Sequence, residues 1–245
     1  MGMPVILEVV DDWVTQAVFE DVFAYFVHID ETFSVYKQTS EISAINRGEI
    51  TWQEASEEMQ TVFRLSEETK QLTHGYFNIQ KPDGTYDPSG LVKGWAIAQG
   101  AELLRQKGFQ NFFVHIAGDI QCSGHNQEGK PWKIGIQNPF SPLQESIKTV
   151  YLSTEGIATS GSYVRGDHIY NPHNPFEKML EVVSLTVIGP NIYEADRFAT
   201  AAYAMGKQGI HFIETLPGLE GYSIDANGLA TMTSGFTYYT QPTYV

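Results

Sequence analysis

Helix-like and strand-like periodicities are segregated along this chain, and that segregation constrains the fold more than any single motif. Apolar residues recur at helical spacing around residues 18–29, 56–74 and 91–107, all in the first half. The second half is mostly short strand-like runs, at 133–137, 149–152 and 182–188, with a helical pattern at 192–205. Because helices and strands do not alternate regularly, the pattern predicts an α+β fold rather than a doubly wound parallel sheet.

Local signals indicate where several elements begin and end. Residues 5–10 predict an opening strand, and residues 112–116 predict a short apolar one. Ser40 is a good cap for a short helix, while Gly75 and Gly108 are typical helix stops. Asn227-Gly228 lies between strand-like runs at 221–226 and 229–233, which predicts a hairpin. At 245 residues, the chain is long enough for one large domain or two lobes around a shared core.

The chain is acidic, with a formal net charge of -14. Such a chain repels nucleic-acid phosphates, so we expect no nucleic-acid partner. It would also repel an anionic substrate unless a local cation or metal intervened, so a polyphosphate ligand would suggest a metal. The single cysteine, Cys122, excludes an intramolecular disulfide.

Targeting signals are not evident in the sequence. No apolar stretch reaches the roughly 18 residues expected of a membrane-spanning helix. The first residues lack a basic region followed by a long apolar run, and there is no lipobox. We therefore expect a cytoplasmic protein without a membrane span.

Common nucleotide-binding and hydrolase motifs are missing as well. There is no G-x-G-x-x-G after a strand, no H-E-x-x-H, no paired C-x-x-C and no G-x-S-x-G. Gly161 and Gly166 have Walker-like spacing, but Asp167 and His168 follow in place of Lys and Ser/Thr. A nucleotide bound by this chain would need another kind of cradle.

Asp87 and Lys93 belong to a loop that enters a helix. The aspartate can cap exposed helical N–H groups, which is a purely structural role. The same loop also offers backbone donors and acceptors to a ligand. The residues alone leave both interpretations open.

Asp196 and Thr200 stand at positions i and i+4 of a predicted helix, so they share one helical face. A carboxylate and a hydroxyl on one face suit a hard cation such as Mg²⁺, which prefers oxygen ligands. The alternative is a surface aspartate beside a threonine that bonds its own helix.

A third segment, 156–163, is rich in small and hydroxyl residues and is followed by His168. Hydroxyls and backbone N–H groups after a strand can hold a phosphate, and His168 can accept a proton near neutral pH. The alternative is a simple turn for the hydroxyl residues and an edge-strand position for His168.

Taken in order, these segments resemble the ApbE family, in which FAD:protein FMN transferases move FMN from FAD onto a Ser or Thr of a target protein. The likeness covers almost the whole chain. Its motifs are Met1-Gly2-Met3, Phe33-Ser34-Val35-Tyr36 through to Asn46, Gly75-Tyr76-Phe77-Asn78-Ile79, Asp87 to Gly94, Ala117-Gly118-Asp119, Thr159-Ser160-Gly161, His168 to Pro172 and Asp196 to Thr200.

The resemblance implies a single two-lobed domain over residues 1–245, with FAD in the cleft between the lobes. It implies that Tyr36 stacks on an aromatic ring of FAD, that Asp87 bonds the flavin or ribityl region, and that Lys93 approaches the cofactor. Further FAD contacts are implied for residues in the shared motifs: Met1, Phe77, Asn78, Ile79, Asp119, Thr159, Ser160, Gly161, Ile169 and Tyr170.

The resemblance also implies a metal and a catalytic group. The backbone carbonyl of Gly90, with Asp196 and Thr200, would hold Mg²⁺ against the pyrophosphate. His168 would lie near the scissile phosphate and, together with Asp196, make up the catalytic set. The chain departs from the family pattern at Met3, Ala117 and Asn171, where relatives usually have Thr, Gly and Asp.

The function implied is Mg²⁺-dependent transfer of FMN from FAD to a Ser or Thr hydroxyl of an acceptor protein, with release of AMP. Two alternatives stay open. Water can replace the protein hydroxyl, giving an FAD pyrophosphatase that yields FMN and AMP. The chain can also be a flavin-binding protein without enzymatic activity.

Overall fold

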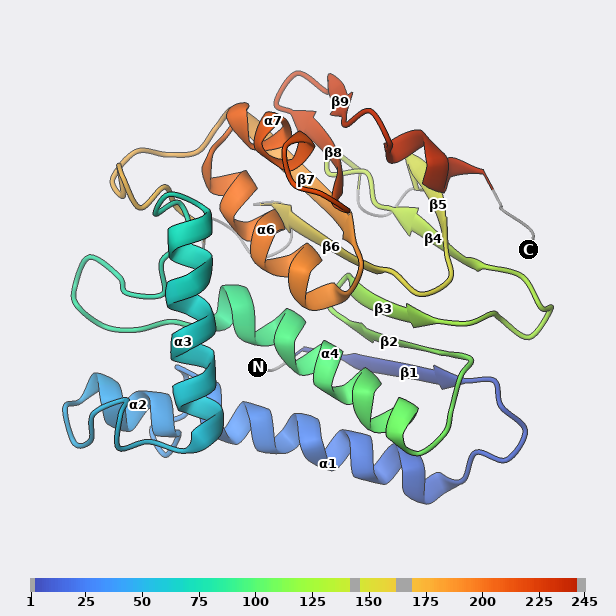
Figure 1. Ribbon diagram of the computed structural model, residues 1–245. Helices are drawn as coiled ribbons and strands as arrows, with labels where there is room; N and C mark the ends of the chain where they lie inside the picture. Colours follow the sequence, from blue (N-terminus) through green and yellow to red (C-terminus); the bar gives the residue numbers. More distant parts are fainter. Residues whose placement is uncertain (1–2, 142–145, 162–168, 242–245) are drawn as a thin grey trace.

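The computed structural model of the chain describes residues 3–141, 146–161 and 169–241, and it has the α+β architecture that the sequence predicts (Figure 1). A seven-stranded antiparallel sheet has the order β1-β2-β3-β6-β7-β8-β9. Its strands are β1 (Val5–Val9), β2 (Phe112–Ile116), β3 (Asp119–Ser123), β6 (Gly156–Gly161), β7 (Val182–Gly189), β8 (Glu220–Asp225) and β9 (Ala230–Met232). A separate two-stranded sheet pairs β4 (Trp132–Ile136) with β5 (Lys148–Leu152).

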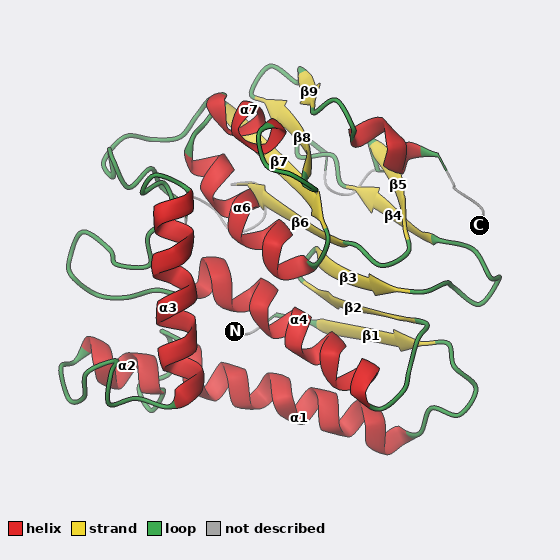
Figure 2. Cartoon of the chain, in the orientation of Figure 1, coloured by secondary structure: helices red, strands yellow, loops and turns green. Residues whose placement is uncertain are grey.

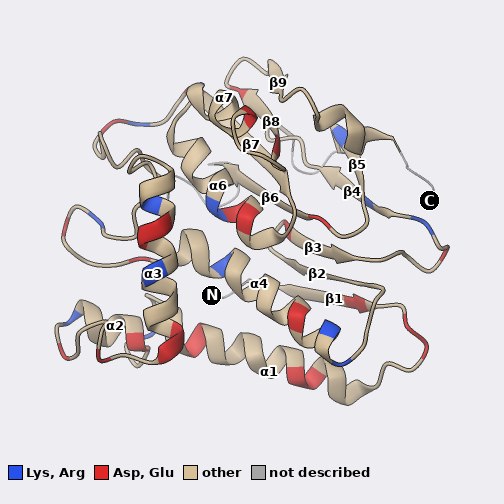
Figure 3. Cartoon of the chain, viewed as in Figure 1, with Lys and Arg blue, Asp and Glu red and all other residues tan. Residues whose placement is uncertain are grey.

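Helices cover one face of the large sheet, so the strands and helices form distinct layers (Figure 2). The helices are α1 (Gln16–Phe33), α2 (Glu41–Asn46), α3 (Glu57–Leu72), α4 (Ser89–Gln106), α6 (Ile192–Ala204) and α7 (Gln208–Glu214), with a 3₁₀ turn η1 at Phe236–Thr240. Charged residues lie mainly on the helices and outer loops, whereas the middle of the sheet is largely uncharged (Figure 3). Within the described residues, no helix combines the length and apolarity needed to cross a membrane.

Alternation along β2 shows how the two faces of the sheet are used. Phe112, Val114 and Ile116 are buried against the helical layer in the larger hydrophobic core. Phe113 and His115 point to the opposite face because successive side chains of a strand alternate. A second, smaller core lies on that opposite face, where β4, β5 and η1 pack against the sheet.

Most local signals in the sequence are confirmed. The Ser40 hydroxyl accepts the Ser43 N–H and caps α2, and Gly108 follows α4 with a φ of 93°. The turn containing Asn227 and Gly228 joins β8 to β9, with the Asp225 N–H donating to the carbonyl of Leu229. The helices predicted at 56–74, 91–107 and 192–205 end within two residues of the observed bounds, which is the usual scatter at helix ends, whereas α1 continues four residues beyond Ile29.

The turn considered as the alternative for Thr159, Ser160 and Gly161 is wrong, and β3 is a strand that the periodicity did not reveal. These hydroxyl residues form β6, an inner strand between β3 and β7. Both strands carry polar side chains inside the sheet, including Asp119, Gln121 and Ser160, all of which are buried. Buried polar side chains that find partners remove the apolar alternation by which a strand is recognised.

Candidate functional site

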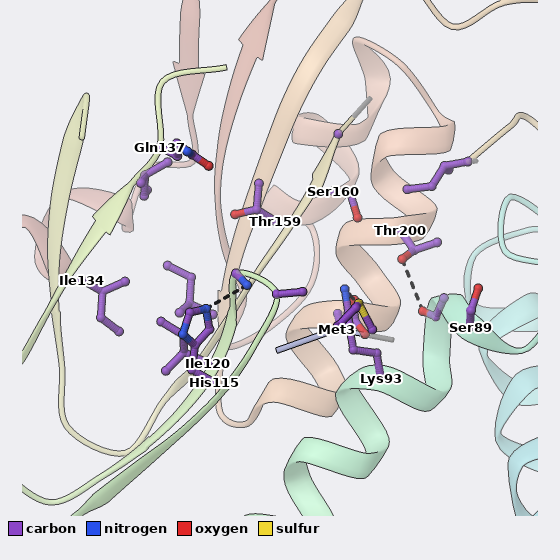
Figure 4. Close-up of a pocket in the computed structure, with 18 of the residues that line it drawn as sticks. Met3, Ser89, Lys93, His115, Ile120, Ile134, Gln137, Thr159, Ser160 and Thr200 are labelled. Carbon is purple, nitrogen blue, oxygen red and sulfur yellow. Dashed lines mark hydrogen bonds and ion pairs between the residues drawn. The ribbon is translucent and has the colours of Figure 1, made fainter. Parts of the chain in front are cut away.

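A cavity of about 940 Å³ opens between the face of the large sheet opposite the helices, the β4–β5 pair and the N-terminus of α4 (Figure 4). One part, the polar end, is lined by Asp87, Ser89, Gly90, Lys93, Asp196 and Thr200. The other part, the apolar wall, is lined by Phe113, Ile120, Cys122, Trp132, Ile134, Ile136 and Ile157. The cavity therefore joins a charged region to a surface that favours flat or aliphatic groups.

The polar end is built where α4 and α6 cross. The Thr200 hydroxyl of α6 donates to the carbonyl of Gly90 at 3.3 Å, which ties the first turn of α4 to α6 (Figure 4). Asp196 lies one turn earlier on the same helical face, and its carboxylate accepts the Gly94 N–H at 2.8 Å. The spacing of four residues thus turns both side chains of α6 toward the start of α4, where Thr200 meets Gly90 and Asp196 meets Gly94.

Lys93 links two buried carboxylates at the polar end. Its ammonium forms an ion pair with Asp119 and lies 3.4 Å from Asp196. Lys93 is 8% exposed, Asp119 1% and Asp196 2%. With one positive and two negative groups, the trio carries a net charge of -1 when both aspartates are ionised. The surface position considered for Asp196 is therefore wrong.

The pKa of the Asp196 carboxyl depends on its burial and on the charges around it. The pKa of the Asp196 carboxyl is raised to about 7, chiefly by burial and also by the nearby Asp119 charge. Lys93 and the Gly94 N–H act in the opposite direction by stabilising the carboxylate. A cation placed beside Asp196 would offset the unbalanced charge.

The residues at the polar end fit a hard divalent cation. They offer a carboxylate, a backbone carbonyl and a hydroxyl, all oxygen donors of the kind that Mg²⁺ prefers. Over the described ranges, no group of three or more His, Cys, Asp or Glu side chains could hold a metal ion. A cation here would therefore depend on Asp196 together with neutral oxygens, which leaves coordination positions for water or phosphate oxygens.

Strand β6 forms another part of the cavity wall. The Thr159 N–H donates to Asp119 at 3.1 Å, and the Thr159 hydroxyl lies 2.8 Å from that of Thr186. Ser160 and Gly161 follow along the strand, and Ile169 and Tyr170 also line the cavity. Asp119 itself is not in the cavity wall, because it lies behind the wall and holds Lys93 and Thr159 in place.

The loop before α4 provides the remaining polar groups. Phe77, Asn78 and Ile79 line the cavity, and the Phe77 N–H donates to the Thr73 hydroxyl at 3.1 Å. Asp87 accepts the Ser89 N–H at 3.1 Å while also lining the cavity. The two interpretations of Asp87, support of the helix entrance and contact with a ligand, are thus compatible.

Besides Asp119, three of the expected site residues are not placed at the cavity. Tyr36 is 88% exposed and does not line the cavity. Met1 and His168 lie outside the described residues. The roles expected for these three residues therefore remain predictions.

Sequence reasoning missed His115 and the apolar wall. The His115 ring accepts the Gly118 N–H through Nε2 at 2.9 Å and lines the cavity (Figure 4). The only available signal in the sequence was a histidine in the predicted 112–116 strand, at a position that alternates with the apolar ones and lies next to the Ala117-Gly118 turn. Lys81 and Lys133 were also missed, although both bring positive charge to the cavity wall.

Comparisons with known proteins agree on a single family. The ApbE family model matches residues 1–83 and 79–223. A Haemophilus influenzae protein named FAD:protein FMN transferase is 33% identical over 135 residues, which is 51% of this chain and 39% of that protein. An Escherichia coli K12 protein of the same name is 32% identical over 163 residues, 62% of this chain and 46% of that protein. The matches thus span less than half the length of these curated relatives.

Solved structures share the fold over nearly the whole chain. The flavin transferase ApbE from Vibrio cholerae superimposes with a TM-score of 0.85 at 22% identity, covering 98% of this chain and 96% of that one. The apbe protein from Thermotoga maritima gives a TM-score of 0.86 at 21% identity, with the same coverage. At this level of identity the likeness establishes the fold.

Proposed function

The chain belongs to the ApbE family, and from that premise we propose that it transfers the FMN part of FAD to a hydroxyl group of an acceptor protein and releases AMP. Relatives that are named FAD:protein FMN transferase support the proposal. Because these relatives are matched over less than half their length, the substrate and the acceptor are inferred for this chain rather than transferred from them.

The observation that carries the proposal is the joining of the polar end and the apolar wall in one cavity. Ligand pockets usually measure about 300–1,000 Å³, so this cavity is at the large end of that range. FAD combines flat rings with a charged pyrophosphate, and those parts need an apolar surface and compensating positive charge respectively. The apolar wall and the polar end supply these two kinds of surface within one cavity.

Mg²⁺ is the cation that we propose for the polar end, held by the Gly90 carbonyl, Asp196 and Thr200. When bound, it would supply positive charge to the pyrophosphate during cleavage. Lys93 contributes a further positive charge, and Asp119 fixes the Lys93 side chain from behind. In a chain with a net charge of -14, these local charges are what allow an anionic ligand to bind.

The remaining residues position the substrate. Thr159, Ser160 and Gly161 present backbone and hydroxyl groups to the phosphates. Phe77, Asn78, Ile79, Asp87, Ile169 and Tyr170 surround the rest of FAD. Tyr36 lies outside the cavity wall, so its exposed ring would stack only on a part of FAD that reaches beyond the cavity.

In the proposed reaction the acceptor hydroxyl oxygen attacks the phosphorus of the FMN phosphate. The bond between that phosphorus and the bridging oxygen breaks, and AMP leaves with both electrons of the bond. The hydroxyl proton passes to His168, which Ile169 and Tyr170 directly follow along the chain; these two residues line the cavity. A neutral imidazole suits this role near physiological pH.

The function is tested by incubating the protein with FAD, Mg²⁺ and a library of Ser- and Thr-containing peptides, followed by mass spectrometry. Peptides that gain FMN while AMP appears in equal amount are the expected result. Free AMP and FMN without a peptide adduct would replace transfer with FAD hydrolysis. Intact FAD that stays bound would reduce the role to flavin binding, and a parallel reaction with EDTA checks the metal requirement.

A further inference from the structure

His115 interrupts the apolar wall with a polar ring. It projects from β2 on the same face as Phe113, and its partner across the β2–β3 pairing is Ile120, which in turn pairs with Ile157 on β6. Trp132 lies across this surface, with its ring 5.1 Å from that of Phe113. The imidazole therefore stands among side chains that would contact a flat, mostly apolar group.

A backbone hydrogen bond sets which nitrogen of His115 carries the proton. The Gly118 N–H points at Nε2 from 2.9 Å, and a backbone N–H can only donate. Nε2 must therefore accept, so the proton of the neutral ring is on Nδ1. Burial lowers the pKa of His115, and the Asp119 charge offsets only part of that shift. A lowered pKa favours the neutral ring.

The Nδ1–H group consequently acts as a donor with a fixed orientation. Among the described residues, no hydrogen-bond partner of Nδ1 is seen, while the side chain lines the cavity. A donor on an otherwise apolar surface selects a ligand atom that accepts. Ring nitrogens and ring carbonyl oxygens are acceptors of this kind, and they occur on flat heteroaromatic groups that suit the apolar wall.

We infer that His115 determines ligand specificity by donating a hydrogen bond from Nδ1 to an acceptor atom on a ring of FAD. This inference rests on the proposed function, because FAD is the ligand that the site is proposed to bind. The acceptor belongs either to the isoalloxazine or to the adenine ring, and binding of the separate halves distinguishes the two.

The same imidazole also has a structural role, which the test must separate. By accepting the Gly118 N–H it holds the Ala117-Gly118 turn, in which both residues have positive φ, 51° and 98°. That turn leads directly into Asp119, the partner of Lys93. Loss of affinity in a simple His115→Ala variant would therefore not reveal which of the two roles had been lost.

Two amide substitutions separate the roles, because each side chain reaches only one of the imidazole nitrogen positions. Glutamine places its amide near the Nε2 position, so His115→Gln keeps an acceptor for the Gly118 N–H and loses the donor to the ligand. Asparagine places its amide near the Nδ1 position, so His115→Asn keeps the donor and loses the bond to the turn. Thermal unfolding reports on the turn, and calorimetric titration with FAD, FMN and AMP reports on the ligand.

We expect His115→Gln to unfold at the wild-type temperature but to bind FAD about tenfold more weakly, the scale of one hydrogen bond made in a largely dry site. We expect His115→Asn to unfold at a lower temperature while keeping most of the FAD affinity. A matching loss with FMN assigns the acceptor to the isoalloxazine, and a matching loss with AMP assigns it to adenine.

Wild-type affinity for FAD in His115→Gln would overturn the inference and leave His115 with the turn alone. Affinity lost equally in both variants would overturn it too, since the turn would then be the common cause. If the wild-type protein bound none of the three probes, the proposed function would fail together with the inference. If it bound FAD but neither transferred FMN nor hydrolysed FAD, only the proposed activity would fail.

Discussion

Asp196 is the single residue on which the proposed metal site depends most. It is the only charged group in the proposed ligand set, whose other members are the Gly90 carbonyl and the Thr200 hydroxyl, and neutral oxygens alone hold Mg²⁺ poorly. We expect Asp196→Asn to lower turnover at limiting Mg²⁺ by at least about tenfold, while its amide oxygen still accepts the Gly94 N–H and preserves the helix crossing.

Thr200→Val is the graded comparison for that experiment, because water can replace a neutral ligand. Its effect on the Mg²⁺ dependence should be smaller than that of Asp196→Asn. The exposed Asp12, changed to Asn, controls for removal of a negative charge elsewhere on the molecule. Turnover of Asp196→Asn equal to that of Asp12→Asn would exclude the proposed site.

The protonation of Asp196 also predicts how Mg²⁺ binding depends on pH. The pKa of this carboxyl is raised from 3.8 to about 7, with burial as the largest cause, so the carboxyl is largely neutral below that pH and must lose a proton to bind a cation. We expect the Mg²⁺ affinity to increase between about pH 6 and about pH 8, with release of close to one proton. Calorimetry in buffers of different ionisation enthalpy measures that proton.

In the metal-free protein, the contribution of Asp196 to the free energy of unfolding changes with pH in the opposite direction to the Mg²⁺ affinity. A carboxyl whose pKa is raised by folding favours the folded state at acidic pH, and this contribution is lost as the pH rises through about 7. Mg²⁺ should compensate the loss at the higher pH. Asp196→Asn should remove both dependences, and their persistence in that variant would assign them to another group.

At the level of elements, the crossing of α4 and α6 sets the geometry of the polar end. A Cβ added at Gly94 would lie 2.6 Å from the Cβ of Asp196 and 2.9 Å from the Ile192 carbonyl oxygen. We expect Gly94→Ala to push the helices apart, lowering both the unfolding temperature and the Mg²⁺ affinity. Steric overlap with backbone outweighs the gain of about 1 kcal/mol that alanine usually brings to a helix.

Gly100 on the same helix provides a matched control. A Cβ there would meet the tip of the Phe26 ring at 2.7 Å, and a ring tip at the end of a flexible side chain can move. Gly100→Ala should therefore leave the Mg²⁺ affinity unchanged. If both glycine variants bound Mg²⁺ as the wild type does, the crossing at Gly94 would not control the site.

The charge of the whole molecule governs the approach of an anionic ligand. A net charge of -14 repels FAD over distances of about 10 Å at 0.1 M salt, and salt screens that repulsion. Without Mg²⁺, we expect the association rate of FAD to rise as KCl increases from about 0.02 to about 0.3 M. Stopped-flow fluorescence measures the rate, with uncharged riboflavin as the control that salt should not affect. A rate that falls with salt would show that Lys81, Lys93 and Lys133 dominate the field at the cavity.

The sequence by itself determined those features that depend on near neighbours along the chain. Helical periodicity located the long helices, Asn227-Gly228 located the β8–β9 turn, and Ser40 marked the start of α2. The shared helical face of Asp196 and Thr200 follows from a spacing of four residues and needs no tertiary information. Resemblance to a family added the order of the motifs and the expectation of FAD.

Tertiary structure decided which distant residues meet and how deeply they are buried. Lys93, Asp119 and Asp196 come from α4, β3 and α6, and only the packing of those elements produces a buried trio with a net negative charge. The proton position on His115 depends on the turn that brings the Gly118 N–H to Nε2. The polar strands β3 and β6 were hidden because burial and partners, rather than apolar alternation, stabilise them. Such properties depend on distances between residues far apart in sequence, and these distances are set by the whole fold.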